Sequence, residues 1–91
     1  MEVTVNRAKT VDFLMDSEGV IHAPMYFDLT AEISDTAKEL FKIIAAYSLK
    51  NSTDNIQPRD FKNLVDQNCD ITKRTMLAIV ELKQNNYIDI T

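Results

Sequence analysis

The chain of 91 residues contains one glycine, two prolines, one cysteine and no tryptophan. So few glycines and prolines exclude a collagen-like, linker-like or low-complexity chain. The single cysteine, Cys69, allows no internal disulfide and no cluster of metal thiolates. No apolar run reaches the roughly 18 residues that a membrane span needs, and the first residues lack the pattern of a signal peptide. We therefore expect a cytoplasmic protein that does not associate with a membrane.

Residues for catalysis and for cofactor binding are also scarce. His22 is the only histidine, and no serine, cysteine or aspartate stands at a recognisable triad spacing from it. A single glycine allows no glycine-rich phosphate loop. The segment 16–19 has acidic residues but lacks the alternation and the closing glutamate of a calcium loop. The sequence therefore predicts a protein that is not an enzyme and that holds neither a metal nor another cofactor.

A surplus of basic residues is missing as well, since the formal net charge is -4. Residues 1–33 hold two basic and six acidic side chains, whereas residues 34–91 hold eight of each. Proteins that bind nucleic acid indiscriminately usually carry a basic surplus, because most of that affinity comes from neutralising phosphates. The charge argues against such binding but leaves room for a local basic patch.

The N-terminal part predicts a β-hairpin. Two apolar runs, residues 10–15 and 20–27, flank a polar tetrad that ends in Gly19, where a positive φ is expected. Pro24 cannot donate to a strand ladder, so the second strand should lie at an edge or break there.

Helices are expected to follow. Ser34 or Thr36 can cap the first of them. Its apolar stripe consists of Ala37, Leu40, Phe41, Ile44, Ala45 and Ser48. Ile43 and Tyr47 form a second apolar line beside that stripe. Residues 50–55 are expected to form a polar loop.

Two further helices complete the expected pattern. A short one begins at Pro58, with Phe61, Leu64 and Val65 on its inner face. A longer one follows a brief turn and runs from Asp70 or Thr72 to about Asn85, and residues 87–90 then alternate as a strand. This order predicts an α+β fold of three helices with an N-terminal hairpin and a short C-terminal strand. It has the outline of a winged helix-turn-helix.

The segments 71–75 (Ile-Thr-Lys-Arg-Thr) and 79–88 (Ile-Val-Glu-Leu-Lys-Gln-Asn-Asn-Tyr-Ile) carry a resemblance to a known family. They resemble the winged-helix DNA-binding domains of plasmid and phage replication initiators and of small bacterial transcriptional regulators. The resemblance covers roughly residues 34–90. It implies one winged-helix domain over residues 1–91, in which residues 1–29 are a hairpin extension and residues 30–91 hold the helix-turn-helix core and the first wing strand.

The same resemblance implies a DNA-binding site. Lys73, Arg74 and Thr75 would approach the major groove at the start of the third helix, and Arg59 and Lys62 would approach phosphates. The chain departs from the family where Asn86 replaces the commoner glycine, and where it ends before a second wing strand. We expect the hairpin to replace that strand by pairing with residues 87–90.

The third helix has two faces at about 100° per residue. Ile71, Thr75, Ala78, Ile79 and Leu82 form the expected core face, so Thr75 belongs both to that face and to the expected DNA contacts. Lys73, Arg74, Leu77, Glu81 and Gln84 lie on the other side. Lys73, Arg74 and Gln84 have side chains suited to base edges, Leu77 is suited to a thymine methyl, and Glu81 would repel phosphates unless it accepts from a cytosine amine.

We therefore expect sequence-specific binding of duplex DNA, in replication initiation or transcription control of a bacterial plasmid or phage. The surplus apolar residues Ile43, Tyr47, Met76, Leu77 and Val80 indicate an interface with the hairpin or with a second subunit, and hence a homodimer. The alternative is a protein-interaction module on the same scaffold, in which the acidic hairpin docks a basic protein partner.

Overall fold

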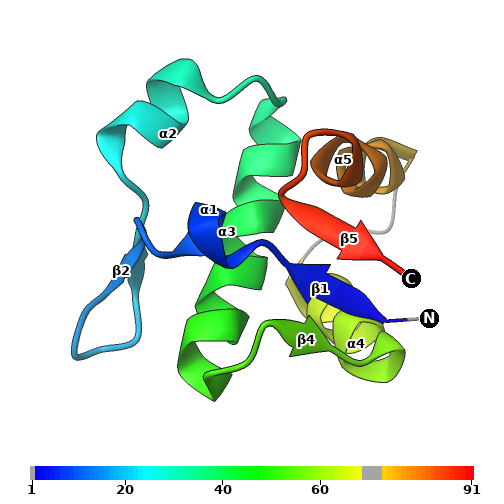
Figure 1. Cartoon of the computed structure of the whole chain (residues 1–91), viewed down its shortest axis with the longest axis horizontal. Helices are drawn as coiled ribbons and strands as arrows, with labels where there is room; N and C mark the ends of the chain where they lie inside the picture. The colour runs from blue at the N-terminus through cyan, green and yellow to red at the C-terminus, as the bar shows by residue number, and fades with distance from the viewer. Residues whose placement is uncertain (1, 69–72) are drawn as a thin grey trace.

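The computed structural model describes residues 2–68 and 73–91, and its central element is helix α3 (Asp35–Asn51) (Figure 1). The helix begins after Ser34, whose side chain accepts a hydrogen bond from the Ala37 backbone amide. Of the two expected caps, Ser34 is therefore the one in use. The buried residues of α3 are the six of the predicted stripe, which confirms that face. Helix α3 contacts α4, α5, β1 and β3, so most of the core forms around it.

A three-stranded antiparallel sheet lies beside α3. Strand β1 (Val3–Val5) is its central strand and pairs with β4 (Asn55–Ile56) on one side and β5 (Ile88–Ile90) on the other. Val3 lies opposite both Ile56 and Ile90, and Val5 lies opposite Ile88. The two ends of the chain therefore run side by side, as Figure 1 shows.

This sheet corrects two expectations. The C-terminal strand pairs with β1, which precedes the hairpin, and not with the hairpin itself. Strand β4 begins at Asn55, the last residue of the expected polar loop, and no strand was predicted there. Residues 1–29 are therefore more than an extension, because they supply the strand that joins β4 to β5. Such pairing depends on partners far along the chain, and a three-residue strand gives little local signal of it.

The predicted hairpin is present, with shorter strands than expected. Strand β2 (Leu14–Met15) pairs with β3 (Ile21–His22), and Gly19 has a φ of 81° in the turn. Helix α1 (Arg7–Thr10) takes the start of the first run, and α2 (Met25–Thr30) takes the end of the second. Pro24 is the N-cap residue of α2, so the second strand ends before it, as its missing N–H predicted.

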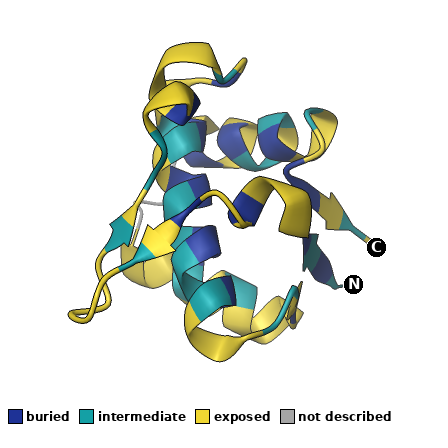
Figure 2. Cartoon of the chain, turned by 60° about the vertical axis from the view of Figure 1, so that its left-hand side comes forward, coloured by how far each residue is buried: buried dark blue, intermediate teal, exposed yellow. Residues whose placement is uncertain are grey.

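Four aromatic rings connect the hairpin region to the helices. Phe13 follows α1, Phe27 is in α2, Phe41 is in α3 and Tyr87 follows α5; all four are buried. The Phe13 ring centroid lies 5.1 Å from that of Phe27 and 5.6 Å from that of Phe41, and Phe41 lies 4.9 Å from Tyr87. Figure 2 shows the contrast with the loop between β2 and β3, which is exposed.

Helices α4 (Pro58–Asn68) and α5 (Lys73–Gln84) complete the described chain. The turn between them was expected over residues 66–70, but α4 continues to Asn68, so the first three of these residues are helical. The rest of that turn and the expected start of the third helix lie outside the described residues. The fold is α+β, as predicted, but residues 2–68 and 73–91 form five helices and two small antiparallel sheets where three helices were expected. No helix in these ranges is long and apolar enough to cross a bilayer.

Candidate functional site

Helices α4 and α5 are held on the core by one apolar face each. Val65 is buried on α4, and Phe61 and Leu64 pack against the core beside it, as the sequence predicted. On α5 the buried residues are Thr75, Ala78 and Leu82. The opposite face of each helix is left for solvent or for a ligand.

The outward face of α5 has a regular pattern. Lys73, Leu77, Val80 and Gln84 are spaced four, three and four residues apart, which places them along one line of an α-helix. All four are exposed, and Leu77 and Val80 are exposed by 57% and 48%. Met76 and Lys83 are also exposed and flank this line. The outward face is therefore apolar at its centre and polar or basic at both ends.

The basic side chains of α4 and α5 differ from most others in the protein because they have no acidic partner. They are Arg59, Lys62, Lys73, Arg74 and Lys83, all exposed, and none forms an ion pair with residues 2–68 or 73–91. By contrast, Arg7, Lys38 and Lys42 each lie within 4 Å of a carboxylate. Lys9 lies 4.9 Å from the centre of the Tyr87 ring. The cations available to an external anion are thus mostly on these two helices.

The one acidic side chain of α5, Glu81, is bound elsewhere in the protein. Its carboxylate accepts hydrogen bonds from the backbone N–H of Ser34 at 2.6 Å and from the Ser34 hydroxyl at 2.9 Å. Glu81 therefore binds beside the N-terminus of α3, where negative charge is favourable. The expectation that Glu81 lies on the DNA-facing side is wrong. Because its carboxylate is bound to Ser34, the outward face of α5 has no free carboxylate.

One expected DNA contact is removed by its burial. Thr75 is 5% exposed, so its side chain faces the protein interior and cannot reach a base edge without rearrangement of α5. Helical periodicity placed Thr75 on the core face, whereas the family resemblance placed it among the DNA contacts, and its burial confirms the first of these positions. Arg59, Lys62, Lys73, Arg74 and Gln84 are all exposed, so the remaining expected contacts lie on the accessible surface.

The expected interface residues divide into two groups. Met76, Leu77 and Val80 are exposed. They therefore do not pack against the hairpin, which was one of the two interfaces expected for them, the other being a second subunit. Ile43 and Tyr47 are half-buried, and Tyr47 packs against the edge of the core. Next to Met76, an open cavity of about 280 Å³ lies between α4 and α5; Phe61, Val65 and Ile79 supply much of its apolar lining. The apolar surface of α5 therefore continues into a shallow groove.

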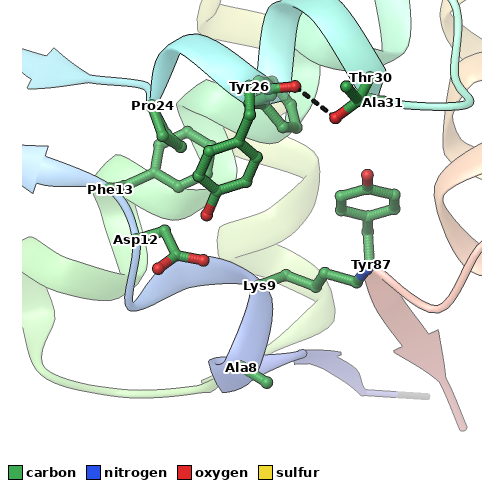
Figure 3. Close-up of a pocket in the computed structure, with 10 residues that line it drawn as sticks. Ala8, Lys9, Asp12, Phe13, Pro24, Tyr26, Thr30, Ala31 and Tyr87 are labelled. Atoms are coloured by element: carbon green, nitrogen blue, oxygen red, sulfur yellow. Dashed lines mark hydrogen bonds between the residues drawn. The ribbon is translucent and has the colours of Figure 1, made fainter.

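A second cavity, of about 320 Å³, lies between α1, α2 and Tyr87 (Figure 3). Lys9 extends toward the Tyr87 ring, and Asp12 lies beside Tyr26. Hydrogen bonding to the Asp12 carboxylate raises the pKa of Tyr26, because that bond favours the neutral phenol. Burial raises the pKa of Tyr87. The two charged side chains that line this cavity, Lys9 and Asp12, each interact with one of its aromatic residues.

The hairpin brings His22 and Asp16 together, with 3.1 Å between His22 Nε2 and Asp16 Oδ2. This hydrogen bond and the one from the Val20 amide hold the pKa of Asp16 below its ordinary value. Both side chains are exposed on a hairpin, and this pairing was not foreseen from the sequence. In the part of the chain that the structure describes, no group of three or more histidine, cysteine and acidic residues is placed to hold a metal ion.

No family model, curated protein or solved structure matches the chain. Its function is therefore argued from the arrangement of its own residues, and the surface formed by α4 and α5 is the candidate site.

Proposed function

We propose that the protein binds duplex DNA with α4 and α5, as a winged helix-turn-helix domain in which α5 enters the major groove. The observation that carries this proposal is the group of five exposed cations on these helices that form no ion pair with residues 2–68 or 73–91. The one carboxylate of α5, that of Glu81, is bound to Ser34. Phosphate contacts supply most of the affinity for DNA and require cations that are free to make them. A net charge of -4 is compatible with this because the free cations are gathered in one region.

The order of elements also supports a winged helix. After α3 come β4, α4, α5 and β5, which is the order of the helices and first two strands in the family that the sequence resembles. The third strand of such a sheet would normally follow β5 through the wing. Here β1 occupies the place between β4 and β5 and is antiparallel to both. The N-terminal strand thus stands in for the third strand of the proposed fold.

Each part of the site has a distinct role in this mechanism. Arg59 and Lys62 bind phosphates and position the domain, and Lys73, Arg74 and Gln84 contact the DNA from α5. Thr75 takes no part because it is buried. In a cell this activity would serve replication initiation or transcription control of a bacterial plasmid or phage.

The test is a fluorescence anisotropy titration of labelled duplex DNA at rising salt, with a double variant in which the two phosphate-binding residues, Arg59 and Lys62, are both alanine. We expect the logarithm of the binding constant of the native protein to fall linearly with the logarithm of the salt concentration. The magnitude of this slope should decrease by about two in the variant, one for each lost phosphate contact. The control replaces Lys38 and Lys42 by alanine. It removes the same charge from α3, where both lysines are already paired, and should leave the slope unchanged. Equal losses in both variants would contradict the proposal.

A second candidate is a protein-interaction surface on the hairpin and α2. Leu14, Met25 and Leu29 are 69%, 79% and 76% exposed there, and Val20 and Tyr26 are exposed nearby. Exposed large apolar side chains on neighbouring segments of the chain favour an interface, and a second copy of the chain would give the homodimer that paired DNA half-sites require. Sedimentation velocity of the native protein and of Leu14→Ser distinguishes this case: a dimer that the variant abolishes supports the surface, and a monomer in both excludes it.

A further inference from the structure

The outward face of α5 has an unusual composition for a surface that contacts DNA. Its centre consists of Met76, Leu77 and Val80, each about half exposed. Lys73 precedes them and Lys83 and Gln84 follow. The three apolar side chains are not covered by any other described element, and the only acidic residue of the helix is bound to Ser34. A partner for this face must therefore offer apolar groups at its centre and negative charge at its two ends.

We infer that α5 recognises the methyl groups of thymine in the major groove, so that the preferred sites are rich in A·T pairs. This inference rests on the proposed DNA binding and names the kind of site that it selects. Thymine presents a methyl group at the floor of the major groove, whereas the other base edges present hydrogen-bond donors and acceptors there. Leu77 and Val80 can pack against this methyl group. Against other base edges they would bury hydrogen-bond donors and acceptors without a partner, which is costly.

The length of the helix suits this arrangement. Lys73 and Lys83 are ten residues apart, which corresponds to roughly 15 Å along an α-helix. The major groove is about 12 Å wide. Cations at the two ends of α5 can then lie near the phosphates that border the groove, while the apolar centre faces its floor.

A second copy of the chain fits this face less well. A two-fold interface formed by α5 and its copy in antiparallel orientation brings the Lys73 end of one helix to the Lys83 end of the other. Like charges in this position repel each other. Glu81 cannot offset them, because its carboxylate is held by Ser34. The phosphates of DNA supply the negative charge that the copy lacks.

The experiment compares four duplexes of equal length by fluorescence anisotropy. One contains A·T pairs, and the second is the same duplex with uracil in place of thymine, which removes only the methyl groups. The third contains G·C pairs, and the fourth has 5-methylcytosine in place of cytosine, which adds a methyl group at the same groove position. We expect the two methylated duplexes to bind more tightly than their partners, by about fourfold for each methyl group that α5 covers.

The variant that tests the residues is the double substitution Leu77→Ala and Val80→Ala. Both side chains are exposed, so the fold should persist, and circular dichroism checks this. The variant should bind thymine and uracil duplexes equally. A matched control, Val11→Ala, removes an exposed apolar group outside α5 (Val11 is 61% exposed) and should keep the full preference for methylated duplexes.

The outcomes separate the two proposals. Salt-dependent binding with no difference between thymine and uracil duplexes would overturn the inference and leave the DNA-binding function standing. No binding to any of the four duplexes at low salt would overturn both. A monomer–dimer equilibrium that is lost in the Leu77→Ala and Val80→Ala variant, without methyl preference in the native protein, would assign this face to a second copy and overturn the inference.

Discussion

Asp16 organises the turn between β2 and β3 with both of its carboxylate oxygens. Oδ1 accepts hydrogen bonds from the backbone amides of Glu18 and Val20, each at 2.9 Å, and Oδ2 lies 3.1 Å from Nε2 of His22. Gly19 supplies the positive φ that the same turn needs. A hairpin with two-residue strands thus depends on one side chain and one glycine for its shape.

These contacts lead to a pH dependence of the hairpin. They hold the pKa of Asp16 below its ordinary value of 3.8, with the His22 hydrogen bond as the largest cause. Because the folded-state pKa is lowered, the stabilisation is present above that ordinary value and is lost as the pH falls through the pKa of the folded state. An NMR titration of the Asp16 carboxyl carbon should give a midpoint below 3.8, and His22→Ala should raise it.

The control for this titration is Val20→Ala, which keeps the backbone amide that donates to Asp16. It should leave the midpoint where it is in the native protein. If His22→Ala also leaves the midpoint unchanged, the His22 hydrogen bond has no influence on Asp16.

Single residues also decide how the helices end. Asn86 has a φ of 64° directly after the α5 region, and Ser52 has a φ of 51° after α3. Both are in the left-handed region that glycine favours, and asparagine tolerates it better than most residues. Asn86 therefore adopts this conformation at modest cost.

Helices α3 and α5 are joined by a polar contact at their ends as well as by apolar packing. The carboxylate of Glu81 on α5 accepts from the backbone and the hydroxyl of Ser34, the cap of α3. The Ser34 oxygen in turn accepts from the Ala37 amide. The carboxylate of Glu81 thus satisfies two hydrogen-bond donors at the N-terminus of α3. The same contact fixes the orientation of α5 and therefore of its outward face.

We expect Glu81→Ala to lower the free energy of unfolding by about 1–2 kcal/mol, since two hydrogen bonds to a half-exposed carboxylate are lost. Glu81→Gln keeps one acceptor oxygen and should lose less. Urea denaturation followed by circular dichroism measures both. Gln67→Ala, at an exposed position of α4, is the control, and an equal midpoint for Glu81→Ala and Gln67→Ala would show that this contact contributes nothing.

Across the whole molecule, β1 connects the two ends of the chain to its middle. It pairs with β4 and β5, and the backbones of Glu2 and Thr91 exchange hydrogen bonds of 2.7 and 3.0 Å. Val3 and Val5 face the core and are almost fully buried, while Thr4 faces the other side of the sheet. The sheet beside the candidate site is therefore incomplete without the N-terminal residues.

Val5→Ala should accordingly lower the free energy of unfolding by about 2 kcal/mol, because two buried methyl groups are lost and the site cannot fully close. Thr4→Ala is the matched control on the same strand. It removes one exposed side-chain hydrogen bond to Asn55 and should cost less than half as much. Thermal and urea unfolding measure both variants, and equal losses would mean that β1 is not packed against the core as described.

The distribution of charge also belongs to this scale. The chain is acidic overall, yet five of the seven basic side chains that form no ion pair with residues 2–68 or 73–91 are on α4 and α5, the other two being Lys9 and Lys50. Arg7, Lys38 and Lys42 lie within 4 Å of a carboxylate. Net charge alone disfavoured a nucleic-acid partner. The pairing of charges in the folded chain, which the composition does not reveal, is what makes a local anion-binding surface plausible on physical grounds.

Local signals in the sequence determined the parts of the fold that depend on a few neighbouring residues. The buried stripe of α3 and the turn at Gly19 were predicted correctly, and the cap of α3 was narrowed to Ser34 or Thr36, of which Ser34 is in use. Caps, helical periodicity and turn glycines can be predicted in this way because they act within one or two turns of chain. The exposure of Arg59, Lys62, Lys73, Arg74 and Gln84 also followed from their type and spacing.

Only the tertiary structure decided which distant segments meet. The pairing of β5 with β1 and the bond from Ser34 to Glu81 across 47 positions both arise from competition among many contacts for the same core surface. Such competition is settled by the total apolar area buried and the polar groups satisfied in the folded chain. No local pattern contains that sum, which is why helical periodicity predicted the buried face of α5, Thr75 included, but placed Glu81 on the opposite face.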